Sequence, residues 1–168
     1  MLLARAVHFD ESDSRIFHRP AVTGEWAISG GFEFSNWTEA DLTGKARQAF
    51  ANGWLGLESF GRVTFVAVAR IEPSEYETLT AALAAHFVSH YGAPSIEAAW
   101  PVAAEEMRQM ADLCADHAPN TVLTVARRLT EAGVAHDRTF DVPAWPTGQI
   151  VTVKREGPGG FVRFGGFP

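Results

Sequence analysis

Two pairs of metal-binding residue types stand at helical spacing in the middle of the chain. His86 and His90 are four residues apart, and Cys114 and His117 are three apart, so each pair would share one face of a helix. Two imidazoles from one helix, with a thiolate and an imidazole from the next, could complete the tetrahedral ligand set of zinc or another divalent metal. Histidines near a helix end and a lone cysteine are also common as structural residues. We therefore expect no cofactor, with zinc or another divalent metal as the alternative.

Other polar residues suggest weaker possibilities. Three further histidines could each act as a general base, but no nucleophile is paired with any of them in sequence: His8, His18 and His136. Three acidic residues near the N-terminus could bind a hard cation, but they lack the twelve-residue spacing of an EF-hand: Asp10, Glu11 and Asp13. We expect these acidic residues to form a solvated turn. Catalytic residues therefore remain unknown from the sequence.

Fingerprints of the common nucleotide, hydrolase and metalloprotease sites are absent. The chain contains no G-x-x-x-x-G-K-[ST], G-x-S-x-G, H-E-x-x-H or C-x-x-C, the motifs that would signal those chemistries. The block from Gly24 to Ile71 instead concentrates large aromatics among glycines. Its aromatic residues could line a ligand pocket, although core packing is the default expectation: Trp26, Phe32, Phe34, Trp37 and Trp54.

The composition is that of an ordinary globular domain. The chain has 168 residues, of which 46% are hydrophobic, and this length suits one domain. Its net charge of −6 argues against a general nucleic-acid binder, which would normally carry a basic face. Neither a signal peptide nor an apolar run long enough to span a bilayer is present in the sequence. With its single cysteine, the chain is expected to be cytoplasmic, without membrane or nucleic-acid partners.

The residue pattern predicts strands first and helices later. We expect strands at Leu3–Phe9 and Arg62–Ile71, the second lying inside a sheet because it is apolar on both faces. Two more elements are expected between them, namely a hairpin around Gly30-Gly31 that pairs Glu25–Ser29 with Phe32–Ser35, and a helix from Thr38 to Ala51. Three helical regions follow: Pro73–His90, a segment starting at Ser95, and Thr121–Ala132.

This order predicts an α+β fold with a mostly antiparallel sheet and three to four helices packed on it. We expect one domain over residues 1–155 and a glycine- and phenylalanine-rich tail over residues 156–168. The tail could order by docking into a groove on a protein partner or on another copy of the chain. Its candidate contact residues are Phe161, Arg163, Phe164 and Phe167. Docking on its own chain and disorder are the alternatives.

Three stretches resemble an uncharacterised bacterial family of short proteins: AVHFDESD, GEWAISGGFEFSNWTEADLTGKARQAFANGWLGLESFGRVTFVAVARI and DHAPNTVLTVARRLTEAGV. The resemblance covers roughly residues 1–133. It implies a genomic setting near genes for formate dehydrogenase and molybdenum-enzyme maturation. It brings no known activity, so no catalytic residue is carried over.

Together these observations favour a non-catalytic accessory or interaction protein, with metalloenzyme assembly as the setting that the resemblance implies. The alternative is a metal- or small-ligand-binding protein that uses the two helices carrying His86, His90, Cys114 and His117. A small-molecule enzyme of unknown class is the third possibility. The expected partner is another protein or a second copy of the chain.

Overall fold

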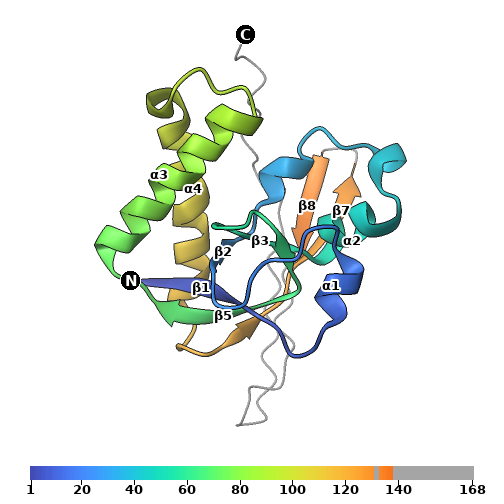
Figure 1. Ribbon diagram of the computed structural model, residues 1–168, viewed down its shortest axis with the longest axis horizontal. Coiled ribbons are helices and arrows are strands. Elements are labelled where there is room, and N and C mark those ends of the chain that lie inside the picture. Colours follow the sequence, from blue (N-terminus) through green and yellow to red (C-terminus); the bar gives the residue numbers. More distant parts are fainter. Residues whose placement is uncertain (131–132, 138–168) are drawn as a thin grey trace.

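The computed structural model describes residues 1–130 and 133–137 (Figure 1). A six-stranded antiparallel sheet has the order β4-β3-β2-β1-β5-β6, and β7 and β8 form a two-stranded ribbon. The elements are β1 Leu2–Val7, α1 Ser12–Ile16, β2 Trp26–Ile28, the 3₁₀ helices η1 Gly31–Phe34 and η2 Glu39–Asp41, α2 Gly44–Asn52, β3 Trp54–Gly56, β4 Arg62–Val63, β5 Phe65–Arg70, α3 Pro73–His90, α4 Ile96–Ala115, β6 Val122–Leu123, β7 Ala126–Thr130 and β8 Gly133–Asp137. This single α+β domain confirms the expected fold class.

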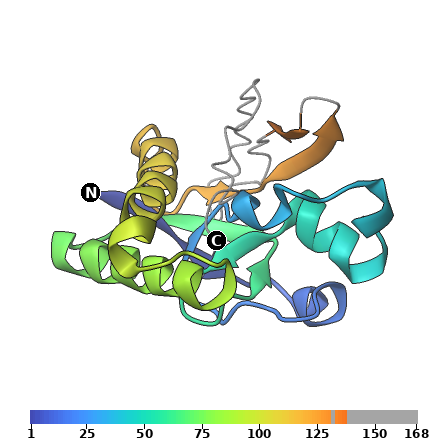
Figure 2. The same ribbon diagram turned by 90° about the horizontal axis from the view of Figure 1, so that it is seen from above.

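The long helices α3 and α4 pack on each other, and α4 lies against β1 and β2. Figure 2 shows this pair at one end of the sheet and α1, α2 and the β7–β8 ribbon at the other. The main apolar core lies under α3 and α4, where Leu83, Phe87 and Met107 are completely buried. A smaller cluster of Phe34, Leu42 and Phe50 joins η1 to α2 at the opposite end. Within the described ranges, no helix is long and apolar enough to cross a bilayer.

The expected interior strand at Arg62–Ile71 is confirmed for its larger part. β5 lies between β1 and β6, and its Val66 and Val68 are completely buried. The chain bends at Thr64, so that Arg62 and Val63 pair with β3 at the far edge of the sheet. Because β4 and β5 are consecutive in the chain but hold the first and fifth positions in the sheet, this bend curls the sheet strongly.

The helix expected over Thr121–Ala132 is wrong. Residues 122–123 form β6 on the edge of β5, and residues 126–130 form β7. Asn120 adopts a left-handed φ of 71°, and its N–H donates to the Val68 carbonyl at 2.7 Å. The segment is rich in β-branched residues, which favour strands once a sheet edge is available. Tertiary pairing therefore overrides the apolar helical spacing on which the prediction rested.

The hairpin around Gly30-Gly31 is also wrong in its second strand. Gly30 adopts a φ of 66°, and the chain then enters η1 instead of returning as a strand. Phe34 of η1 is completely buried and packs edge-on against Phe50, with ring centroids 5.4 Å apart. The helix predicted from Thr38 is divided in two. Thr38 and Asp41 form a capping box on η2, and α2 starts only at Gly44.

Candidate functional site

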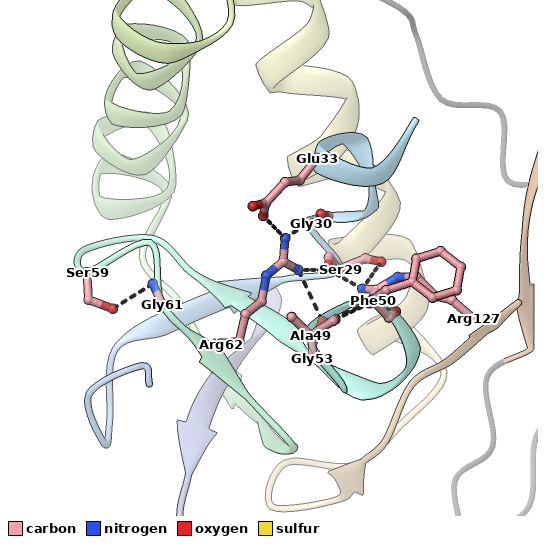
Figure 3. Close-up of polar contacts among 10 residues, drawn as sticks. All are labelled: Ser29, Gly30, Glu33, Ala49, Phe50, Gly53, Ser59, Gly61, Arg62 and Arg127. Atoms are coloured by element: carbon pink, nitrogen blue, oxygen red, sulfur yellow. Dashed lines mark hydrogen bonds and ion pairs between the residues drawn. The ribbon is translucent and has the colours of Figure 1, made fainter. Parts of the chain in front are cut away.

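Two buried arginines hold together η1, α2, β3 and β7 (Figure 3). Arg62, on the edge strand β4, donates to the carbonyls of Gly30 at 2.9 Å and Gly53 at 3.1 Å. It also forms an ion pair with Glu33 of η1. A buried guanidinium requires such partners, because its desolvation is costly unless its donors are satisfied. Arg62 therefore fixes the loop that follows β2 against the start of β3.

Arg127, on β7, approaches the same point from the other side. It donates to the carbonyls of Phe50 at 2.9 Å, Gly53 at 2.8 Å and Ala49 at 3.4 Å, and also to that of Ser29. The last carbonyls of a helix have no partner inside the helix, and a cation there also complements the helix dipole. Arg127 thereby anchors the β7–β8 ribbon to the C-terminal end of α2.

Phe34 lies against both guanidinium groups. The centre of the Arg62 guanidinium is 4.6 Å from the Phe34 ring centroid, and that of Arg127 is 5.4 Å from it. Cation–π contacts of this kind gain strength where water is excluded. The two arginines and the ring form a rigid floor beneath the surface.

A cleft of about 250 Å³ opens beside this floor. Its lining comes from the loop after α1, from η1 and the residues after it, from α2 and from the turn before β4: Phe17, His18, Arg19, Glu33, Phe34, Trp37, Lys45, Ala46, Ala49, Phe60 and Arg62. The cleft therefore combines aromatic walls with cationic groups. Such a volume holds a side chain or a small anion, since drug-sized ligands occupy about 300–1,000 Å³.

Arg19 and Lys45 differ from the other cations of the cleft. Both are exposed, and neither side chain makes a hydrogen bond or ion pair with any other residue in the described part of the chain. Arg62 is instead fully engaged by Glu33 and by backbone carbonyls. Arg19 and Lys45 are thus the cleft groups that can meet an external negative charge.

Phe60 forms one wall of the cleft in an unusual conformation. Its φ of 52° lies in the left-handed region, which is costly for a bulky side chain. Its ring stacks on His86 of α3 with ring centroids 3.7 Å apart. Burial, together with the neighbouring His90, lowers the pKa of His86 from 6.5 to about 4. His86 is therefore neutral at physiological pH and serves as an aromatic support behind the cleft wall.

The chain matches one family model along most of its length. Residues 1–143 match a family of unknown function, DUF6505. The chain belongs to this family. No curated protein and no solved structure matches it. Membership confirms the uncharacterised family suggested by the sequence and assigns no chemistry, which leaves the geometry of the site as the guide to function.

Three of the four metal-ligand candidates lie on α3 and α4, and His117 follows the end of α4. His86 and His90 lie together, with ring centroids 4.5 Å apart. Cys114 is completely buried in the main core, and burial lowers the pKa of His117. Among the residues described by the structure, no group of three or more His, Cys, Asp or Glu side chains is arranged to hold a metal ion. Metal binding by these residues stays a prediction for direct analysis.

The other sequence candidates have varied positions. His18 is exposed in the cleft, whereas the tail residues Phe161, Arg163, Phe164 and Phe167 lie outside the described residues. Of the five aromatic candidates, Trp26, Phe32, Phe34 and Trp54 are buried, while Trp37 is half-buried on the cleft. The expectation of a solvated acidic turn is wrong for Asp13, because this residue is 4% exposed and lies beside His8.

Phe34, Trp37 and His18, which the sequence offered as candidates, line the cleft, but sequence reasoning missed its cations and the two buried arginines beneath it. The residue pattern places Arg62 in an apolar strand and Arg127 in a helix that does not form. A possible signal is the position of Arg62 directly after Gly61, next to a turn, where a charged residue begins an otherwise apolar run. The four lining segments lie within residues 17–62 but belong to different elements, so no single helical or strand spacing links them.

Proposed function

We propose that the protein is a non-catalytic accessory protein that docks a partner protein through this cleft. In this proposal an acidic side chain of the partner enters between Arg19 and Lys45 and rests on the aromatic walls. The supporting observation is the unengaged pair of cations at the rim of a small aromatic cleft, on a chain whose net charge is −6. Complementary charge at such a rim steers association and selects partners.

The chemistry of the cleft favours binding over catalysis. Of the described cleft residues, Glu33 is the one carboxylate, and it is already paired with Arg62. His18 also lines the cleft and could act as a general base, but the described lining residues include no hydroxyl or thiol for it to activate. Phe34 and Phe60 are held by their ring contacts. A partner that binds against them therefore loses little affinity to the ordering of these side chains.

The setting we propose is metalloenzyme assembly in the cytoplasm of bacteria. The gene for this protein would lie near genes for formate dehydrogenase and molybdenum-enzyme maturation. This setting rests on the sequence resemblance alone. The glycine- and phenylalanine-rich tail would contribute a second contact with the partner or with another copy of the chain. The alternative function is metal or small-ligand binding on α3 and α4, which the same experiment tests.

The experiment compares the double charge reversal Arg19→Glu/Lys45→Glu with wild type. The matched control is Arg15→Glu/Arg70→Glu, which changes the net charge equally at exposed positions outside the cleft. Tagged proteins are expressed in the native organism, and co-purifying proteins and bound metals are quantified from the same preparation.

We expect the cleft variant to lose its specific partners at least about tenfold, because two attractive contacts become repulsive. The control should retain them. Equal partner recovery from both variants would refute the cleft as the docking site. Stoichiometric zinc that disappears in His86→Ala or Cys114→Ala would favour the alternative function.

A further inference from the structure

A hydroxyl, an imidazole and a carboxylate lie in series at the end of β1, outside the cleft. Thr23 Oγ1 is 2.5 Å from His8 Nδ1, and His8 Nε2 is 3.3 Å from Asp13 Oδ2. This order of groups is the one that activates hydroxyl nucleophiles in acyl-transfer sites. We propose that Thr23 is a nucleophile that accepts acyl groups from activated esters or thioesters, with His8 as its general base and Asp13 as the residue that orients His8. This inference is independent of the proposed docking function.

The carboxylate end of the series is fixed by the fold. The side chain of Asp13 is 5% exposed, although it is charged. Its oxygens accept hydrogen bonds from the Thr64 hydroxyl at 2.6 Å and the Thr64 N–H at 3.2 Å. Because Thr64 forms the bend between β4 and β5, the carboxylate is tied to the point where the chain passes between these two strands. Asp13 can therefore hold the imidazole in one orientation.

The hydroxyl end is held by a β-bulge. Gly24, with a φ of 88°, and Glu25 together oppose Ala6, since Gly24 N donates to Ala6 O at 2.9 Å and Ala6 N donates to Glu25 O at 2.8 Å. The Arg5 guanidinium also donates to the Gly24 carbonyl at 2.7 Å. Bulges that begin with a left-handed glycine re-aim neighbouring side chains and recur beside active sites. Here the bulge supports the turn that presents Thr23 to His8.

The placement of protons on Thr23, His8 and Asp13 suits nucleophilic attack. When the imidazole proton is on Nε2, the nitrogen 3.3 Å from Asp13 Oδ2, the Nδ1 lone pair faces the Thr23 hydroxyl. Thr23 Oγ1 attacks the carbonyl carbon of the donor, and its proton passes to His8 Nδ1. The new O–C bond forms as the C–O or C–S bond of the donor breaks, and His8 returns the proton to the leaving oxygen or sulfur. The products are a Thr23 ester and a free alcohol or thiol.

The surroundings favour an acyl donor with an apolar body. Phe9 and Val22 are the chain neighbours of His8 and Thr23, and they are 54% and 62% exposed. Phe9 is held edge-on against Phe65, with ring centroids 5.0 Å apart. Exposed apolar side chains next to the reacting groups can cover an acyl chain and remove it from water.

The test uses 4-nitrophenyl acetate as the acyl donor and the full chain as the protein. Nitrophenolate release is followed by absorbance, and the acetylated residue is located by peptide mass mapping. The key variants are Thr23→Val, Thr23→Ser and His8→Asn, since asparagine can occupy the Nδ1 position but cannot take a proton. Thr78→Val is the matched control, because Thr78 is an exposed threonine whose hydroxyl donates to a backbone carbonyl.

We expect an acetyl ester on Thr23 in wild type and on the introduced hydroxyl in Thr23→Ser. His8→Asn should slow acetylation at this position about 10²-fold, the usual contribution of general base catalysis, and Thr23→Val should abolish it. The control should match wild type. Absence of the Thr23 ester in wild type, or an equal rate in His8→Asn, would overturn the proposal and leave the three residues as a structural brace for β1. Thr23 is exposed, so its variants keep the test valid even if His8→Asn is poorly folded.

Discussion

Replacing Arg127 by methionine tests whether the buried guanidinium holds the β7–β8 ribbon to α2. Methionine has a similar length and keeps the apolar part of the side chain, but it removes every donor. The substitution removes short hydrogen bonds to the carbonyls of Phe50 at 2.9 Å and Gly53 at 2.8 Å, along with contacts to Ala49 and Ser29. Gly53 and Ser29 keep a bond from Arg62. The loss is therefore concentrated at the end of α2.

The magnitude follows from these contacts. Two charge-assisted hydrogen bonds contribute about 1.5–3 kcal/mol each. These values already include desolvation, so the two bonds together contribute about 3–6 kcal/mol. Because the Gly53 carbonyl keeps its bond from Arg62, only part of this is lost, and the free energy of unfolding should fall by about 2–4 kcal/mol. Since domains of this size lose about 2–4 °C per kcal/mol, Tm should fall by about 5–15 °C.

The assay is urea unfolding followed by tryptophan fluorescence, because Trp26 and Trp54 are buried reporters. Arg70→Met is the control, since Arg70 is exposed at the end of β5. Arg127→Lys should fall between wild type and Arg127→Met, because lysine keeps the charge but lacks the planar fork. A free energy of unfolding for Arg127→Met within about 0.5 kcal/mol of the Arg70→Met value would refute the reasoning, since surface changes have effects of that size.

Two further substitutions test other parts of the structure. Gly56→Ala would place a Cβ far inside contact distance of Glu25 Oε1, so the carboxylate that accepts the N–H groups of Glu58 and Ser59 must move. We expect a loss of about 1–3 kcal/mol in urea unfolding, and an unchanged midpoint would contradict this packing. His86→Phe should keep the stacking on Phe60. It should also make the Tm less dependent on pH on the acid side. The depressed His86 pKa, about 4 against 6.5, means that wild type loses stability as pH falls from about 6.5 towards 4. The effect should stay well below the ~1.4 kcal/mol per pKa unit of a buried group because His86 is half-buried, and parallel Tm profiles for the two proteins would show the reasoning to be wrong.

The sequence predicted those elements whose pattern is local. β1, β5 and α3 have apolar runs or stripes that do not depend on distant partners, and α3 begins and ends at the expected residues Pro73 and His90. The segment 121–132 carries an apolar stripe that fits a helix, but pairing with β5 decides its structure. Helical spacing alone cannot report a free sheet edge, so this error could not be avoided from the pattern.

The candidate sites were harder to predict than the fold. Cys114 and the histidines of α3 were predicted as metal ligands because their spacing is that of residues on one helix face. His8 and Thr23 are fifteen residues apart, and the bulge that brings them together depends on the register of β1 and β2. Asp13 is buried because it bonds to Thr64 at the bend between β4 and β5. The apolar sequence around Thr64 gives no sign of this bend. Contacts that depend on register and bends leave no periodic signal.

Buried charges connect these sites to the fold. Asp13, Glu25, Arg62 and Arg127 are each about nine-tenths buried or more, and each bonds to backbone groups where a strand or helix ends. A buried charge is costly unless such partners are in place, so it is retained where irregular backbone must be satisfied and fixed. The segments secured in this way, which include the turn of Thr23 and the cleft floor below Arg19 and Lys45, can present exposed reactive or cationic groups from a rigid base. Chemistry and rigidity therefore coincide at the irregular parts of the fold, where substitutions of the buried charges should affect stability and substitutions of the exposed groups should affect function alone.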